Sequence, residues 1–314
     1  MELPRTGTPG VLALVFVGLG ALTLFAMRPR WGELPHYEPE TPPRFEAAFR
    51  TMAEHDAHME GKSWPYVVAL EPSGVEAGRR PADAGTLPGG GPALLYYGSW
   101  HTQDPADPQI ARMRALWDEF GPTVAVTENR LGFYLAALGD GVGMHGEFAL
   151  AGELGRRDGI PVYTLEPSWA VEVEALKREF SAEDLIVFYT LRVFLSERDG
   201  TAPEKRETLA EHLLGKRAGR AGLGREHVPD LARFDEVWRE RFPGLGDWRT
   251  LPREAVDPSG EPTRLQHVAN RVNEIRDEHA AAVILDLLAK GERVFAIAGG
   301  SHVVKQEPVL RAGI

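Results

Sequence analysis

The stretch RVFAIAGGSH, residues 293–302, is the most informative part of the sequence, because an uninterrupted apolar run leads directly into glycine, serine and histidine. Three other short runs have the same apolar character: ALLYY at 93–97, TVAV at 123–126 and PVYTL at 161–165. Runs that are apolar throughout, rather than alternating, are typical of strands that helices cover on both faces. We therefore expect four strands of a largely parallel sheet.

Segments with helical spacing lie between these runs, at 108–120, 147–157 and about 263–290. Alternation of strands and helices predicts an α/β fold, with a largely parallel central sheet flanked by helices. The run WPYVVAL at 64–70 fits a further strand, and 45–59 fits a helix.

Residues from about 170 to 262 interrupt this alternation. They are charged, have helical propensity and contain a basic loop, GKRAGRAGLGR, at 215–225. We interpret them as a helical insertion in the α/β domain rather than a separate domain.

The N-terminal run GVLALVFVGLGALTLFAM, residues 10–27, carries no charge and is just long enough to cross a hydrocarbon core of about 30 Å as a helix. It predicts an uncleaved transmembrane helix within residues 1–27. A cleaved signal peptide and a buried helix are the alternatives, but no Ala-x-Ala cleavage site follows the run. A proline-rich spacer follows at 28–43, and the α/β domain occupies 44–314.

The side of the membrane that the domain occupies stays open. Arg28 and Arg30 follow the span and Arg5 precedes it, and this difference of one charge favours a cytoplasmic domain only slightly. The predicted protein is a membrane-anchored, single-pass protein.

Composition excludes several kinds of site. The chain has no cysteine, which rules out disulfides, thiolate nucleophiles, iron–sulfur clusters and cysteine-ligated zinc. Its 35 basic and 46 acidic residues give a net charge of −11, so we expect no nucleic-acid partner.

Polar side chains follow the carboxyl end of each of the four apolar runs. They are Ser99 and His101 after the first run, Glu128 and Arg130 after the second, Glu166 after the third, and Ser301 and His302 after the fourth. In an open α/β sheet the functional crevice lies beyond these ends, so we expect the side chains to converge there. Each residue alone would more often be a loop residue or a helix cap; their shared position favours a site. Glu147, which begins a helix after a glycine-rich loop, is a further candidate.

Two other patterns are weaker. Residues 141–146 fit the Gly-x-Gly-x-x-Gly dinucleotide fingerprint, with Glu166 at the distance of a ribose-binding acid, but no predicted strand directly precedes them. His55 and His58 share a helix face without a well-placed acid nearby. We expect neither a dinucleotide site nor a metal site at these positions.

Two Gly-x-x-His motifs, a glutamate that ends the next strand, and an Arg-Asp pair 26 residues before the second histidine resemble the TraB/Tiki family. That family belongs to a broader group with the erythromycin esterases, the haem-binding ChaN lipoproteins and the pheromone-shutdown protein PrgY. The matching residues are Gly98, His101, Glu128, Arg276, Asp277, Gly299 and His302. The resemblance covers roughly residues 93–314.

The resemblance implies a membrane-tethered, metal-dependent hydrolase similar to the Tiki metallopeptidases, acting on a peptide or small molecule. A divalent ion, Zn, Mn, Co or Fe, would be bound by His101, His302 and Glu128. Glu166 is the alternative to Glu128 as the carboxylate ligand, and Glu147 or Glu166 would act as the general base.

Supporting roles are also implied. Arg276 would orient a glutamate or stabilise an oxyanion, and Asp277, Arg130, Ser99 and Ser301 would support the residues that contact the ion. The chain departs from the family pattern at Thr127-Glu128-Asn129-Arg130 and after the second histidine, where we expect the last structural element to be short or absent.

Two other functions remain open. The chain could be a metal-free esterase, in which a histidine activates water and glutamates orient it. It could also be a non-catalytic module that binds haem or a peptide signal.

Overall fold

The computed structural model describes residues 34–40, 44–71, 91–128, 130, 141–220, 222–258 and 263–314. The predicted transmembrane helix at 10–27 lies outside these residues. Within them, every helix is too short or too polar to span a bilayer.

A five-stranded sheet lies at the centre of the α/β unit, with strand order β1-β2-β5-β3-β4. The strands are β1 (Tyr66–Leu70), β2 (Ala93–Ser99), β3 (Val124–Thr127), β4 (Val162–Thr164) and β5 (Arg293–Gly299). Four of them are parallel and β1 is antiparallel at one edge. The prediction of a mixed α/β fold with a largely parallel sheet is confirmed, and each of the four apolar runs forms a strand.

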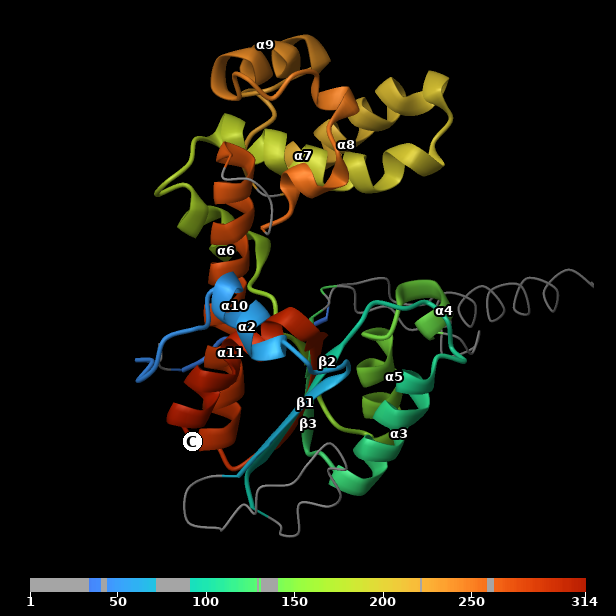
Figure 1. The fold of residues 1–314 in the computed structure, drawn as a ribbon, viewed down its shortest axis with the longest axis vertical. Coiled ribbons are helices and arrows are strands. Elements are labelled where there is room, and N and C mark those ends of the chain that lie inside the picture. The colour runs from blue at the N-terminus through green and yellow to red at the C-terminus, as the bar shows by residue number, and fades with distance from the viewer. Residues whose placement is uncertain are drawn as a thin grey trace, which may run out of the picture.

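Helices cover both faces of the sheet (Figure 1). α3 (Pro108–Phe120) and α5 (Ala149–Asp158) pack on one face, and α10 (Arg264–Ala289) and α11 (Gly300–Ala312) pack on the other. Neighbouring residues of β2 point to opposite faces, so that Leu95 joins one apolar cluster and Tyr96 the other. This two-sided burial explains why the strands are apolar at consecutive positions.

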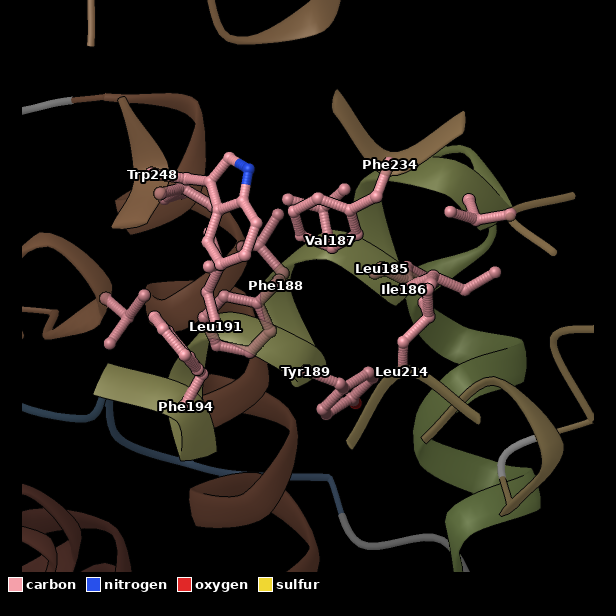
Figure 2. Packing of buried hydrophobic residues seen from close by; sticks show 14 of the residues in the cluster. Leu185, Ile186, Val187, Phe188, Tyr189, Leu191, Phe194, Leu214, Phe234 and Trp248 are labelled. Atoms are coloured by element: carbon pink, nitrogen blue, oxygen red, sulfur yellow. The ribbon is translucent and has the colours of Figure 1, made fainter. Parts of the chain in front are cut away.

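The segment predicted as a helical insertion forms helices with a core of their own (Figure 2). These are α6 (Trp169–Leu176), α7 (Ala182–Glu197), α8 (Arg206–Arg220) and α9 (Leu231–Arg241), with 3-10 turns at Arg198–Gly200, Pro203–Lys205, Trp248–Thr250 and Arg253–Val256. Phe194 and Phe234 both pack edge-on against Trp248 at the centre of this core. The prediction of a basic loop at 215–225 is wrong for its first half, because residues 215–220 belong to α8. The apolar side chains of α8 pack in the helical core.

α10 joins the two cores. Its residues from Leu265 to Ile275 pack into the helical core, and those from Ala280 to Leu288 pack against the sheet. Arg276 and Asp277 therefore lie where the two cores meet.

Two predicted elements differ from the structure. The last element is not short or absent: α11 runs for 13 residues, because Val303, Val304, Val309 and Leu310 bury against the sheet. The predicted helix at 45–59 begins only at Met52, as α2 (Met52–Met59), where Thr51 and Glu54 form a capping box.

Residues 34–40 of the predicted spacer pack on the folded domain. The Leu34 N–H donates to the Arg130 carbonyl at 2.8 Å, and the Thr164 N–H donates to the Pro35 carbonyl at 3.1 Å. The Tyr37 hydroxyl donates to Asp286 on α10 at 2.5 Å. This part of the segment is fixed along β4 and α10.

Candidate functional site

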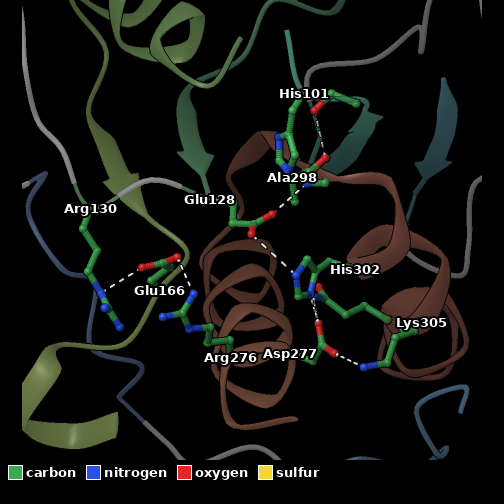
Figure 3. Close-up of polar contacts among 12 residues, drawn as sticks. His101, Glu128, Arg130, Glu166, Arg276, Asp277, Ala298, His302 and Lys305 are labelled. Atoms are coloured by element: carbon green, nitrogen blue, oxygen red, sulfur yellow. Dashed lines mark hydrogen bonds and ion pairs between the residues drawn. The ribbon is translucent and has the colours of Figure 1, made fainter. Parts of the chain in front are cut away.

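The carboxyl ends of the parallel strands meet at one edge of the sheet, and the predicted site residues lie there in two groups (Figure 3). We call His101, Glu128, Glu147, Asp277 and His302 the histidine cluster. We call Arg130, Glu166, Glu172 and Arg276 the arginine cluster. The sequence predicted one site, and the structure divides it.

His101 lies in the loop after β2 and is held by Glu147. Its Nδ1 is 3.0 Å from Glu147 Oε1, which also accepts a hydrogen bond from the Ser99 hydroxyl at 3.0 Å. The other Glu147 oxygen accepts from the Thr102 N–H at 3.0 Å. Glu147 is buried, whereas 74% of the His101 side chain is exposed. The hydrogen bond to Glu147 is the main cause that raises the pKa of His101 above its ordinary value.

His302 lies in the first turn of α11 and is held by Asp277 from α10. The distance from His302 Nδ1 to Asp277 Oδ1 is 2.6 Å, and Asp277 also accepts from Lys305 at 2.6 Å and Gln306 at 2.8 Å. Burial opposes the charged form of His302, but the facing carboxylates of Glu128 and Asp277 outweigh it and raise the pKa to about 9. Only 16% of this side chain is exposed, so the second histidine is much more enclosed than the first.

Glu128 lies between the two histidines. One of its oxygens accepts from the Gly299 N–H at 2.7 Å, and the other is 3.5 Å from His302 Nε2. A Cβ placed on Gly299 would lie 3.3 Å from Glu128 Oε2 and 3.8 Å from both His101 Cε1 and His302 Cδ2. The three side chains therefore border one point, and glycine leaves that point open.

The donor chemistry of this cluster fits a divalent metal ion. Both histidines use Nδ1 to contact a carboxylate, which is the usual way in which a protein fixes a metal-binding imidazole. Two ligands of one tetrahedral ion lie about 3.4 Å apart, close to the 3.5 Å between Glu128 and His302. Among the described residues, no group of three or more His, Asp or Glu side chains is found that could hold a metal ion as they stand.

The arginine cluster is a closed network of ion pairs. Glu172 on α6 accepts from Arg130 at 2.8 Å and from Arg276 at 2.8 Å, and its second oxygen accepts from the Tyr189 hydroxyl at 2.6 Å. Burial opposes ionisation of Glu172, but Arg276 and Arg130 outweigh it and lower the pKa to about 2. Sequence reasoning missed Glu172; its signal was a glutamate with valine on both sides in the segment WAVEVEAL.

Glu166 belongs to the arginine cluster, although its position after β4 suggested a ligand or general base. Its two oxygens lie 2.8 Å from Arg130 Nε and 3.0 Å from Arg276 Nη1. Both carboxylate oxygens of Glu166 are therefore paired with arginines. Arg276 pairs with this glutamate and contacts Glu172 as well.

The predicted supporting residues have separate positions. Ser99 donates to Glu147 of the histidine cluster, and Asp277, a member of that cluster, contacts His302. Arg130 belongs to the arginine cluster and also lies over the Trp169 ring, 3.9 Å from its centroid. Ser301 is in the first turn of α11, and its hydroxyl makes no hydrogen bond to any described residue.

The two weaker sequence patterns have other structural roles. Gly141–His145 forms the short helix α4, and Gly146 has a φ of +79°, which glycine adopts without strain. His55 and His58 on α2 contact different partners, Asp56 at 2.8 Å and the Tyr66 hydroxyl at 2.8 Å.

No protein-family model matches this chain, and no similar protein is found among curated proteins or solved structures. The function proposed below therefore rests on the side chains just described and on the motifs of the sequence.

Proposed function

We propose that the protein is a metal-dependent hydrolase of a peptide or other small substrate, and that the histidine cluster is its active site. One observation carries the proposal: His101 and His302 are each held at Nδ1 by a carboxylate, and Glu128 lies between them. The resemblance of the motifs to the TraB/Tiki family supports the same reaction class.

His101 Nε2, His302 Nε2 and a Glu128 oxygen are the atoms that would hold the ion. Nitrogen and oxygen donors without thiolate suit Zn, Mn, Co or Fe. Such an ion lowers the pKa of a bound water to about 7 and so supplies a nucleophile at neutral pH.

The carboxylates have different roles in this proposal. Glu147 and Asp277 are enclosed and fully engaged, so they position the imidazoles and fix their tautomers. Glu128 has one oxygen directed toward His302, and 20% of its side chain is exposed. Glu128 is therefore the carboxylate best placed to contact an ion or to accept a proton from water.

The arginine cluster supports this arrangement from α10. Arg276 is clamped by Glu166 and Glu172, and the next residue, Asp277, holds His302. The cluster thus fixes the part of α10 that carries a positioning carboxylate. The uncharged run at 10–27 supports our proposal that the enzyme is tethered to a membrane.

The test is hydrolysis by the full chain in detergent, with p-nitrophenyl acetate and a fluorogenic peptide mixture as probes. We expect turnover that EDTA abolishes and that added zinc, manganese, cobalt or iron restores. His302→Ala and Glu128→Gln should each lower the rate at least about 100-fold. His212→Ala is the matched control, because His212 is exposed on α8 in the helical unit.

Other results would select another function. Hydrolysis that resists EDTA but requires His101 would replace the proposal with a metal-free esterase. A Soret band on addition of haem, without hydrolysis, would replace it with a binding module.

A further inference from the structure

Arg192 on α7 is a cation beside the site, and it belongs to neither cluster. Tyr189, three residues earlier, donates its hydroxyl to Glu172 of the arginine cluster. Residues three apart share a face of a helix, and helical side chains lean toward the N-terminus. Arg192 is therefore on the face of α7 that is directed toward the arginine cluster.

Arg192 is close to the clusters and accessible to solvent. Its strongest electrostatic interactions are with Arg276, Glu166 and Glu172, followed by Glu128 of the histidine cluster. Protein atoms around the guanidinium lower its pKa by desolvation, yet the residue remains exposed. In the described part of the chain, no hydrogen bond or ion pair engages this side chain.

The nearby glutamates do not need Arg192 as a partner. Glu166 pairs one oxygen with Arg130 and the other with Arg276. Glu172 bonds both arginines through one oxygen and Tyr189 through the other. Two carboxylates thus balance two guanidinium groups, and Arg192 adds one positive charge. A planar guanidinium with free donors matches a singly charged carboxylate in bidentate geometry.

Apolar side chains border the same edge of the sheet. The large hydrophobic residues that are exposed in the described part of the chain are Trp64, Trp100, Met144 and Val171. Trp100 precedes His101, Val171 precedes Glu172, and Met144 lies three residues before Glu147. The Trp64 ring lies so close to Gly300, at the start of α11, that a Cβ there would overlap it. These side chains offer apolar contact area at the edge where the two clusters lie.

We propose that Arg192 binds the carboxylate of a substrate that also carries apolar groups, as the C-terminal residue of an apolar peptide does. This inference rests on the proposed function, since it names a feature of the substrate hydrolysed at the histidine cluster. Arg192 would hold one end of the substrate from the helical unit, while the histidine cluster on the α/β unit acts on another part.

The test compares a carboxylate with its neutral counterpart. Isothermal titration of the full chain with 3-phenylpropionate and with 3-phenylpropionamide measures binding without any need for hydrolysis. We expect the acid to bind at least about tenfold more tightly than the amide, as hydrogen bonds to a charged group provide. Arg192→Gln should remove the preference. Arg178→Gln should retain it, because Arg178 is an exposed arginine that follows α6 without a side-chain partner among the described residues.

Two results would overturn the inference. One is equal binding of acid and amide by the wild-type chain. The other is a preference that persists in Arg192→Gln, because the carboxylate would then bind to another cation, including a metal ion at the histidine cluster. A thermal melt of Arg192→Gln that matches the wild type confirms that the variant is folded.

The failure of this inference and the failure of the hydrolase proposal can be told apart. An acid preference that depends on Arg192, together with absent hydrolysis, would refute the enzyme and retain the anion site. Hydrolysis without an acid preference would refute the anion site alone.

Discussion

The histidine cluster and the arginine cluster lie at the same edge of one sheet, but their chemistry differs. In the arginine cluster both oxygens of each glutamate are bonded, and Glu172 is fully buried. In the histidine cluster His101 is largely exposed, and its Nε2 has no hydrogen bond or ion pair to any described residue. A closed network gives rigidity, whereas open donor atoms can bind something else. We therefore propose a stabilising role for the arginine cluster and a chemical role for the histidine cluster.

The largest expected effect is on stability and arises in the arginine cluster. Glu172→Gln leaves Arg130 and Arg276 enclosed without their shared carboxylate, so we expect the free energy of unfolding to fall by about 3–5 kcal/mol. Urea denaturation measures it. Glu174→Gln, an exposed glutamate on the same helix, should change it by less than about 0.5 kcal/mol. A loss in Glu172→Gln no larger than in this control would contradict the assigned role.

The same glutamate predicts a pH dependence. Its pKa is about 2 in the folded protein, below its ordinary value of 4.5. A lowered pKa contributes stability that is fully present above pH 4.5 and is lost as the pH falls toward 2. The stability difference between wild type and Glu172→Gln should therefore shrink by about 3 kcal/mol over that range. Urea midpoints at several pH values test this; a constant difference would be inconsistent with an ionised Glu172.

The smallest stability effect is expected beside the histidine cluster, where the motif glycines provide a matched pair. A Cβ on Gly98 would lie 2.8 Å from the Tyr66 carbonyl oxygen, which is fixed by the sheet. Gly98→Ala should therefore cost about 1–3 kcal/mol. At Gly299 the nearest atom is the Glu128 carboxylate, which can move. Gly299→Ala should cost less than about 1 kcal/mol but lower hydrolysis at least about tenfold.

Comparison of melting curves and initial rates for the two variants separates these effects. If Gly299→Ala destabilised the chain as much as Gly98→Ala while hydrolysis was retained, the open point beside Glu128 would have only a structural role.

Much of the sheet could be predicted because burial on both faces leaves a direct record in the sequence. Leu94, Leu95 and Tyr96 are consecutive and apolar since each contacts a covered face. The strand order could not be predicted, because the insertion of β5 between β2 and β3 depends on contacts between residues about 170 to 200 positions apart. Likewise, the extent of α11 depends on packing against the sheet, which the short sequence after His302 does not reveal.

The sequence predicted that the candidate residues lie at the carboxyl ends of the strands, but it did not predict that they separate into two clusters. His101, Glu128 and His302 could be found because each follows a strand end. Glu166 also follows a strand end, but its direction is set by Arg130 and Arg276, two distant residues whose approach no spacing predicts.

Glu172 and Arg192 were missed for another reason. Both lie on helices of the insertion, where a charged residue ordinarily indicates a solvated face. Only the packing of α6 and α7 against α10 brings them to the site.

The central claim is that His101, Glu128 and His302 bind one catalytic ion, and metal content tests it most directly. The full chain is loaded with zinc and dialysed against metal-free buffer, and its zinc content is measured by inductively coupled plasma mass spectrometry. We predict about one equivalent of zinc per chain in the wild type and in His212→Ala, and its loss in His101→Ala and in His302→Ala. Two results would contradict the account: a wild-type chain that retains no zinc, or histidine variants that retain as much zinc as the wild type.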